Sequence, residues 1–212
     1  MINEIQPTGE SLTSRSGLCI FNNYLENVKI LELFEKEFGY LRRSSKSQPV
    51  YQIIKQLIHY FVEGSSFRLT RFDEVKAENG YGDLIGLKQK DLLSSHQVKR
   101  FFKKLKKREL NKLRKILKEI FICRLKSESP NIIVLNIDTM VMDNNEAKIR
   151  EGVEYTYKKV KGFQPLQLTW NNYIIDGLFR SGKKHSNYNH EALKMIKKAV
   201  RRIRNIAPMF RY

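Results

Sequence analysis

Residues 131–143, NIIVLNIDTMVMD, are the stretch from which the fold of this chain is inferred. Five apolar residues, four of them β-branched, lead up to a carboxylate: Ile132, Ile133, Val134, Leu135 and Ile137. A run of this composition after Pro130 favours a strand that is buried on both faces. Asp138 ends the run, and a buried carboxylate is costly unless it is hydrogen-bonded or binds a cation. Asp138 is therefore the first candidate for a functional residue.

The chain after this strand alternates in a way that predicts more strands and then a helix. Asn171-Asn172 is a good tight-turn pair between two of the strands, and Trp170 beside it is expected to pack or cover the turn. The predicted elements are strands at 131–142, 153–159, 163–170 and 173–180, a loop at 181–189, a helix at 190–204 and the beginning of another strand at 206–212.

The chain before Pro130 has helical spacing of its apolar residues. Gly39 and Gly64 are natural helix stops, and Ser94-Ser95 is a plausible helix cap. The predicted helices cover 22–38, 49–62, 67–77, 96–105 and 109–125. We therefore expect an α+β chain with a helical, basic and DNA-binding region at 1–128 and a second domain at 129–212.

The charge of the chain is its strongest compositional feature. Its 40 Lys and Arg against 22 Asp and Glu give a net charge of +18. The excess is segregated: residues 1–87 carry 10 basic and 11 acidic groups, 88–130 carry 15 and 4, and 131–212 carry 15 and 7. Such an uneven excess indicates a polyanionic partner, most simply nucleic acid.

Other classes of protein are disfavoured by the sequence. No apolar run has the roughly 18–20 residues that a membrane span needs, and no secretion signal is recognisable. Cys19 and Cys123 lie far apart without metal-ligand spacing, which fits small core residues in a reducing compartment. We therefore expect a cytoplasmic protein that does not bind membranes.

The basic helix around residue 100 is a candidate phosphate-contacting surface. Phe101, Phe102 and Leu105 are expected to anchor it to the core. The alternative is an ordinary solvated helix face, but few acidic residues interleave to neutralise the cations. The candidate DNA-binding residues here are Lys99, Arg100, Lys103, Lys104 and Lys107.

The order of strand, hairpin strands, helix and strand is that of the first half of a ribonuclease H-like domain. The stretch IDTMVMDNNEAKIREGVEYTYKKVKGFQPL (137–166), followed by GLFRSGKKHSN (177–187), resembles bacterial insertion-sequence transposases of the DDE superfamily, in the insertion-sequence-four-like group. The upstream segments SGL..F..YL, EGSSFRL and SSHQVKRFF resemble the helical N-terminal region of the same proteins. The resemblance covers residues 16–212.

The resemblance implies metal-dependent cutting and joining of DNA by three carboxylates that bind two Mg²⁺ or Mn²⁺ ions. Asp138 matches the first aspartate. Thr139 follows it directly, however, whereas the family's Asp-x-Thr pattern has one residue between the aspartate and the threonine. Asp143 is the second choice, since local hydrogen bonding in a turn explains it more simply. Arg180, Lys183, Lys184 and His185 follow the hairpin and are either DNA contacts near the active site or residues of a soluble loop.

The resemblance places the second aspartate after a strand starting at residue 207 and the final glutamate far beyond it. Glu191 cannot replace that glutamate, because it opens the helix before this strand. We therefore expect a C-terminally truncated transposase that binds metal weakly or not at all and is inactive alone. Its expected partners are DNA at transposon ends and another copy or a full-length transposase.

Two other functions stay open at this point. One is a non-enzymatic DNA-binding protein that modulates a full-length transposase. The other is a metal nuclease whose remaining carboxylates come from a partner chain. A half-sheet also has an unpaired edge, which predicts low stability or aggregation.

Overall fold

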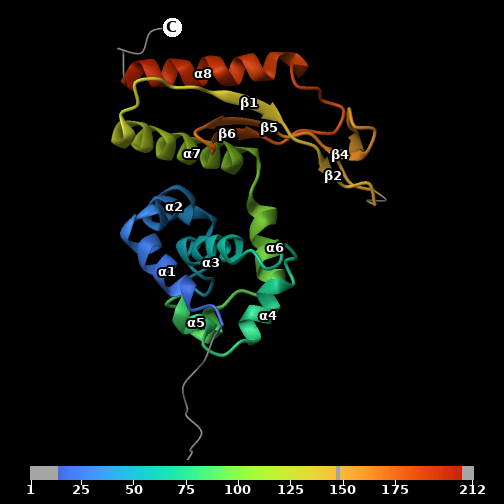
Figure 1. The fold of residues 1–212 in the computed structure, drawn as a ribbon. Coiled ribbons are helices and arrows are strands. Elements are labelled where there is room, and N and C mark those ends of the chain that lie inside the picture. Colours follow the sequence, from blue (N-terminus) through green and yellow to red (C-terminus); the bar gives the residue numbers. More distant parts are fainter. Residues whose placement is uncertain (1–13, 147–148, 207–212) are drawn as a thin grey trace, which may run out of the picture. The chain divides into compact units, whose positions relative to one another are not determined.

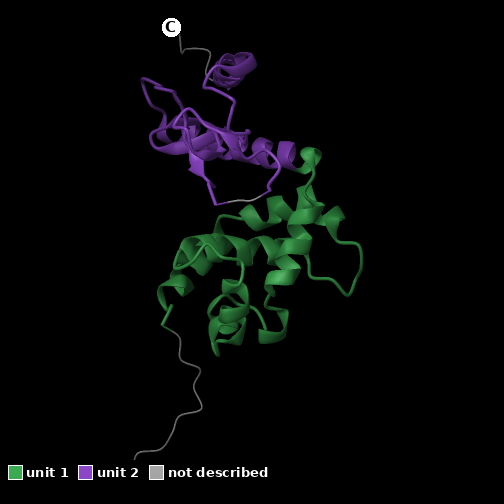
Figure 2. Ribbon diagram, turned by 90° about the vertical axis from the view of Figure 1, so that its right-hand side faces the viewer, with its two compact units in different colours: residues 1–109 green, residues 110–212 purple. Residues whose placement is uncertain are grey.

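The structure is a computed structural model that describes residues 14–146 and 149–206. The chain forms two compact units, residues 1–109 and 110–212, which Figure 2 shows in green and purple. The predicted boundary near residue 128 differs from this division. Most of the helix that precedes residue 128 belongs to the second unit, because Phe121, Ile122 and Leu125 on that helix pack into the core around the sheet.

Unit 1 is helical, as its spacing of apolar residues predicts. Its elements are α1 (Gly17–Asn27), α2 (Ile30–Phe38), η1 (Gly39–Leu41), α3 (Val50–Glu63), α4 (Arg71–Ala77), α5 (Tyr81–Leu84), η2 (Gln89–Asp91) and α6 (Ser95–Lys104). One core cluster joins α1, α4 and α5 with the segment that follows α5, and it includes Leu18, Val75, Leu84 and Ile85. None of the described helices of either unit is long and apolar enough to cross a membrane.

The single helix predicted at 22–38 is wrong, since α1 and α2 are separate helices. The break lies at Val28 and Lys29, where Lys29 has the left-handed backbone angle φ 55°. A non-glycine residue seldom adopts this conformation, so the sequence carries no signal for it. The apolar spacing continues on both sides of the break and hides it.

Two local signals for helix ends are confirmed. Gly64 follows α3 in the left-handed conformation, with φ 64°, and its N–H donates to Tyr60 O. Ser94 caps α6 in a capping box, in which its Oγ accepts from Gln97 N–H and Gln97 Oε1 accepts from Ser94 N–H. Both motifs satisfy backbone groups that a helix end leaves open. The helix predicted at 67–77 is shorter, because α4 begins at Arg71.

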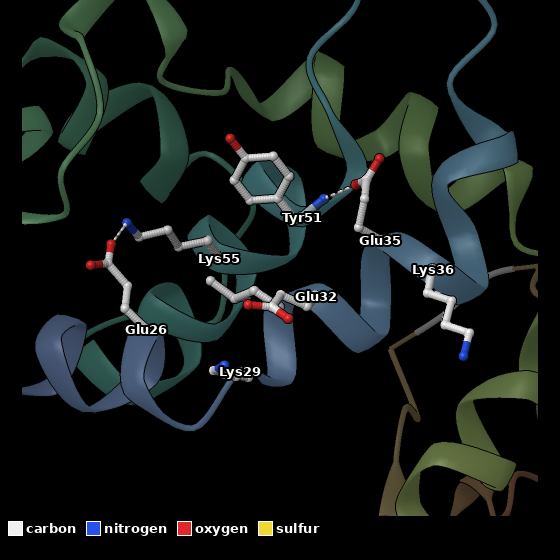
Figure 3. A pocket seen from close by; sticks show the side chains of 8 residues that line it. Glu26, Lys29, Glu32, Glu35, Lys36, Tyr51 and Lys55 are labelled. Atoms are coloured by element: carbon white, nitrogen blue, oxygen red, sulfur yellow. Dashed lines mark hydrogen bonds and ion pairs between the residues drawn. The ribbon is translucent and has the colours of Figure 1, made fainter.

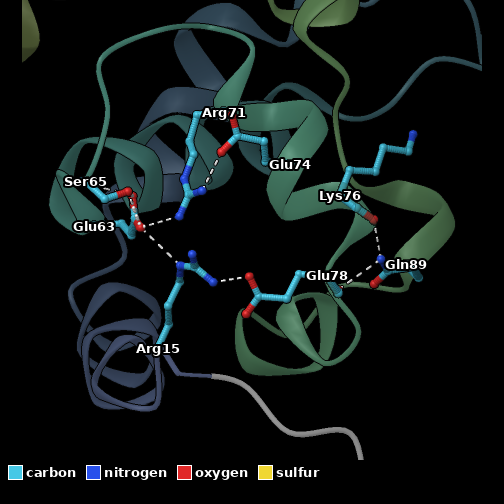
Figure 4. A network of polar contacts seen from close by, with 8 residues as sticks. All are labelled: Arg15, Glu63, Ser65, Arg71, Glu74, Lys76, Glu78 and Gln89. Carbon is cyan, nitrogen blue, oxygen red and sulfur yellow. Dashed lines mark hydrogen bonds and ion pairs between the residues drawn. The ribbon is translucent and has the colours of Figure 1, made fainter.

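An ion-pair network holds the start of the described chain against α3 and α4 (Figure 4). Glu63 Oε1 accepts from Arg15 Nε and from Arg71 Nη2, each at 3.0 Å. Arg15 also pairs with Glu78, and Arg71 with Glu74. Burial raises the pKa of Glu63, but hydrogen bonds from Ser65, Arg71 and Arg15 outweigh burial and lower the pKa to about 2.

Unit 2 combines short strands with two long helices. Its elements are α7 (Lys107–Glu128, of which the first three residues belong to unit 1), β1 (Asn136–Thr139), β2 (Met142–Asp143), β3 (Glu154–Tyr155), β4 (Lys161–Phe163), β5 (Leu166–Trp170), β6 (Tyr173–Leu178), η3 (Tyr188–His190) and α8 (Glu191–Ile206). The predicted strand at 206–212 is outside the described residues, except that Ile206 ends α8.

The six strands within the described residues form two antiparallel sheets, in the orders β1-β5-β6 and β2-β4-β3. The strand predicted at 131–142 is therefore two strands, β1 and β2, in different sheets. Asn171 and Asn172 connect β5 to β6 with φ angles of 45° and 65°, which confirms the predicted tight turn. The α+β fold class is confirmed. A three-stranded sheet followed by α8 is the order expected for the first half of a ribonuclease H-like domain.

The core of unit 2 lies where α7 and α8 pack on β5. Leu166, Leu168 and Trp170 alternate along β5 and are almost completely buried together with residues of both helices. Figure 1 shows the strands β1, β5 and β6 between α7 and α8. The Trp170 ring meets Phe121 edge-on at 5.6 Å between centroids, so the expectation that Trp170 packs is confirmed.

Candidate functional site

Among the described strands, β1 lies at the edge of its sheet, and the side chain of Asp138 on β1 is exposed. The neighbours Ile137 and Thr139 are half-buried, and Gln167 of β5 is the cross-strand partner of Asp138. The prediction of a strand buried on both faces is therefore wrong. Before β1, Ile132 is 76% exposed and Val134 is 60% exposed. Because Asp138 faces solvent, its charge needs no partner to offset burial.

Asp143 forms a hydrogen bond within the turn after β2, as predicted for a turn residue. Its Oδ1 accepts from Asn145 N–H at 2.8 Å. The neighbouring backbone also closes on β4, because Asn144 N–H donates to Lys161 O at 2.9 Å. A carboxylate used in this way stabilises the turn, so Asp138 stays the better candidate for chemistry.

A pair of catalytic metal ions needs more ligands than the surroundings of Asp138 provide. Within residues 14–146 and 149–206, no three His, Cys, Asp or Glu side chains come together in a way that could hold a metal. Two Mg²⁺ ions require several oxygen ligands that they share. The described residues around Asp138 therefore do not fit a two-metal site.

Most of the candidate DNA-binding cations on α6 and at the start of α7 are accessible to solvent. Lys99, Arg100 and Lys103 are exposed, and so is Lys107 at the start of α7. Lys104 is half-buried, and its Nζ donates to Leu41 O at 3.1 Å. Phe101 is buried and anchors α6, whereas Phe102 is exposed and does not.

Arg180 differs most from its expected place, because its side chain is buried within unit 2. Its Nε donates to Gln164 O at 2.9 Å, and its Nη1 donates to His185 O at 3.2 Å. Nη1 also lies 3.4 Å from Glu191 Oε2 at the start of α8. Arg180 thus ties the loop that follows β6 to the segment between β4 and β5 and to α8, and it presents no guanidinium to solvent.

The two lysines after Arg180 are accessible. Lys183 is exposed and pairs with Glu154 Oε1 at 2.6 Å, and this hydrogen bond raises the pKa of Lys183 and lowers that of Glu154. Lys184 is half-buried, with its Nζ 5.0 Å from the ring centroid of Tyr188. Both lysines lie on the loop that packs against the β3–β4 hairpin.

The exposed face of α8 is a basic surface that the sequence prediction did not include. Its cations recur at helical spacing, and each of them is exposed: Lys194, Lys197, Lys198, Arg201 and Arg204. Glu191 is the acidic residue of this helix, and it lies at the first position. The signal was present in the sequence, because apolar residues recur at helical spacing within 190–204 and these cations fall between them, on the opposite face of the predicted helix.

A buried ion pair that the sequence prediction also missed joins α7 to β6. Asp176 accepts from Arg114 Nε and Nη2 at 2.8 and 2.9 Å, and from Lys118 Nζ at 3.0 Å. Burial raises the pKa of Asp176, but the hydrogen bonds and charges of these cations prevail and lower it. Arg114 and Lys118 are therefore engaged within the fold.

A pocket in unit 1 has a volume of ≈ 510 Å³ (Figure 3). Its lining comprises Glu26, Lys29, Leu31, Glu32, Glu35, Lys36, Tyr51 and Lys55. Three glutamates balance three lysines, and Lys55 Nζ lies 2.7 Å from Glu26 Oε1. This balance of charges does not favour a polyanion, unlike the basic face of α6 and the basic face of α8.

Comparison with known proteins identifies a family. A family model described as transposase DDE domain group 1 matches residues 3–212. No curated protein and no solved structure matches the chain.

Proposed function

The chain belongs to the family of transposase DDE domains, group 1, and from this premise we propose that it binds DNA through the basic faces of α6 and α8. Transposases act on DNA. The exposed cations of α8 carry the proposal, since Lys194, Lys197, Lys198 and Arg201 form one stripe without an interleaved acid. Each cation that contacts a phosphate releases counterions, so such a stripe binds DNA in a salt-dependent way.

The exposed end of α6, in unit 1, is a separate proposed DNA contact. Lys99, Arg100 and Lys103 are accessible there, and the buried Phe101 fixes the helix to its core. Lys107, Lys183 and Lys184 are weaker candidates, the last two because each has a neighbour within the fold. Arg180 is not part of the proposed surface, because its side chain is buried.

Asp138 is proposed as a metal-binding carboxylate that this chain cannot use alone. Family members generally use divalent metal ions, but the described residues bring no group of three or more His, Cys, Asp or Glu side chains together that could hold a metal. The proposed activity of the chain alone is therefore DNA binding without cleavage. The metal-dependent strand transfer typical of the family would need carboxylates in addition to Asp138.

A second proposal is a non-enzymatic protein that modulates a full-length transposase. The position of β1 supports it, because β1 is at the edge of its sheet among the described strands and an edge strand offers backbone groups for pairing with another chain. Such a protein would compete for transposon ends or pair with the sheet of the enzyme. Both proposals include DNA binding. Only the second adds an effect on a full-length transposase.

The test combines binding and cleavage on the whole chain. Fluorescence anisotropy with a duplex should show an affinity that falls steeply with salt, and replacing Lys99, Arg100 and Lys103 with Gln should reduce the slope of log K against log[salt] by about 2–3. Salt-independent binding would refute the proposal. Mg²⁺-dependent cleavage that Asp138→Asn abolishes would refute the claim that the chain alone does not cut.

A further inference from the structure

The β3–β4 hairpin exposes two tyrosines among lysines. Residues 154–161 read EYTYKKVK, in which Tyr155 is 64% exposed and Tyr157 is 63% exposed. Lys158 and Lys159 at the tip are also exposed. Large aromatic surface is usually buried, so two neighbouring exposed rings on one short hairpin call for a partner.

The tip of the hairpin is held in one conformation by its own hydrogen bonds. Thr156 donates to Val160 O from both its N–H and its Oγ1, each at 2.9 Å. Lys159 N–H donates to Thr156 O at 2.9 Å, and Lys159 takes the left-handed φ of 60°. The two tyrosines therefore project from an ordered turn, which lowers the entropy cost of binding a ligand.

The base of the hairpin is clamped to its neighbours. A Cβ on Gly162 would lie 2.1 Å from Met142 O, and one on Gly182 would lie 2.1 Å from Glu154 O. These close approaches fix β4 against β2 and fix the loop after β6 against β3. The hairpin and Asp138 belong to the same unit. β2, which follows β1 in the chain, pairs with β4 of the hairpin, so the hairpin lies beyond the end of β1.

Cations lie beside both exposed rings. Lys161 Nζ is 5.6 Å from the ring centroid of Tyr155, and Lys158 Nζ is 5.9 Å from that of Tyr157. Lysines alone suffice to contact the phosphates of a duplex. Aromatic rings add affinity when bases are unstacked and free to lie on them, as in single-stranded DNA-binding proteins.

We propose that the β3–β4 hairpin binds unpaired nucleotides of DNA, with bases stacked on Tyr155 and Tyr157 and phosphates beside Lys158 and Lys159. The inference rests on the proposed DNA binding. It adds that the hairpin prefers unpaired nucleotides to a duplex. Charge complementarity favours a nucleic acid over an apolar protein partner, because the tip combines its rings with two adjacent exposed lysines.

The experiment compares single-stranded and duplex DNA by fluorescence anisotropy on the whole chain. We expect Tyr155→Ala and Tyr157→Ala each to weaken binding of a twelve-nucleotide oligo(dT) by about tenfold. Duplex binding should change by less than about twofold, since a duplex is held mainly by phosphate contacts. Tyr24→Ala is the matched control, because Tyr24 is 61% exposed but lies in the near-neutral part of the chain.

A tryptophan at the tip distinguishes stacking from a merely structural role. Tyr157→Trp should retain the oligo(dT) affinity that Tyr157→Ala loses, and the fluorescence of the introduced tryptophan should be quenched when oligo(dT) binds. Trp170 is only 1% exposed and should contribute a constant background. Far-ultraviolet circular dichroism checks that each variant is folded.

Three results would overturn the inference. They are unchanged oligo(dT) affinity in both alanine variants, an equal loss for duplex and single strand, and a change in oligomeric state by sedimentation with DNA affinity unchanged. The last would identify a protein interface instead. If the native chain bound the duplex but not oligo(dT), only the hairpin proposal would fail; if it bound neither, the proposed function would fail as well.

Discussion

Asp176 on β6 accepts two parallel hydrogen bonds from the guanidinium of Arg114 on α7, at 2.8 Å from Nε to Oδ1 and 2.9 Å from Nη2 to Oδ2. The carboxylate is buried, and Lys118 and the backbone N–H of Gly177 supply further donors. Paired geometry of this kind is both strong and directional. It fixes the start of α7 relative to the sheet within unit 2.

We predict that Asp176→Asn destabilises the chain. The amide leaves the donors of Arg114 and Lys118 incompletely satisfied, and breaking a well-buried pair costs about 3–5 kcal/mol. Since both cations are partly exposed, they regain hydration, and we expect about 2 kcal/mol in urea unfolding. Glu119→Gln is the control, because it removes a more exposed pair with Lys115 and should cost under about 0.5 kcal/mol. Equal effects of the two variants would contradict the structural role of Asp176.

Glu63 predicts an acid-sensitive contribution to stability. Its pKa is lowered from 4.5 to about 2 in the folded chain, so the folded state favours the ionised form. The resulting stability is fully present above pH 4.5 and disappears as the pH falls from about 4.5 to about 2. The difference in unfolding free energy between the native chain and Glu63→Gln should therefore shrink over that range. A difference that stays constant between pH 7 and pH 3 would show that the ion-pair network does not stabilise the ionised carboxylate of Glu63.

Asp138→Asn should leave stability and DNA binding unchanged. The side chain is exposed, so removal of its charge should alter the unfolding free energy by less than about 0.5 kcal/mol. The measurements are urea unfolding and anisotropy with a duplex. A large loss of stability would mean that Asp138 has a structural partner, and would weaken its candidacy as a metal ligand.

The basic stripe of α8 should contribute several phosphate contacts. Replacing Lys197, Lys198 and Arg201 with Gln should lower the slope of log K against log[salt] by up to about 2–3 for a duplex. The control removes the same charge from the near-neutral part of the chain, by replacing Lys29, Lys36 and Lys46 with Gln. If both triple variants weaken binding equally, net charge and not the α8 surface explains the affinity.

The features that sequence predicted well are those with local causes. Ser94 caps α6 through a residue three positions away, Gly64 ends α3 through its own φ angle, and Asn171-Asn172 forms a turn between adjacent strands. Each depends on a few consecutive residues, whose preferences are strong. The α+β class follows from the same local patterns.

The features that sequence missed depend on distant parts of the chain. Asn136 and Asp138 are exposed on one face of β1, whereas Ile137 and Thr139 on the other face are half-buried, and an apolar run does not reveal which face of a strand stays open. Arg180 is buried because Gln164, His185 and Glu191 surround it, whereas a loop lysine or arginine is usually solvated. The stripe on α8 was recoverable, since helical spacing alone places its cations together.

Two glycines of unit 2 provide a last prediction. A Cβ on Gly182 would lie 2.1 Å from Glu154 O and 2.5 Å from Gly162 O, so Gly182→Ala must move backbone apart at the base of the hairpin. We expect a loss of about 1–3 kcal/mol in urea unfolding, as for other overpacked sites. Gly177→Ala is the matched control, because a Cβ there would meet nothing within 4 Å, and it should be nearly neutral. Gly182→Ala should also weaken oligo(dT) binding, since the hairpin depends on this clamp. Equal stability of the two variants would show that the loop after β6 does not hold β3 in place.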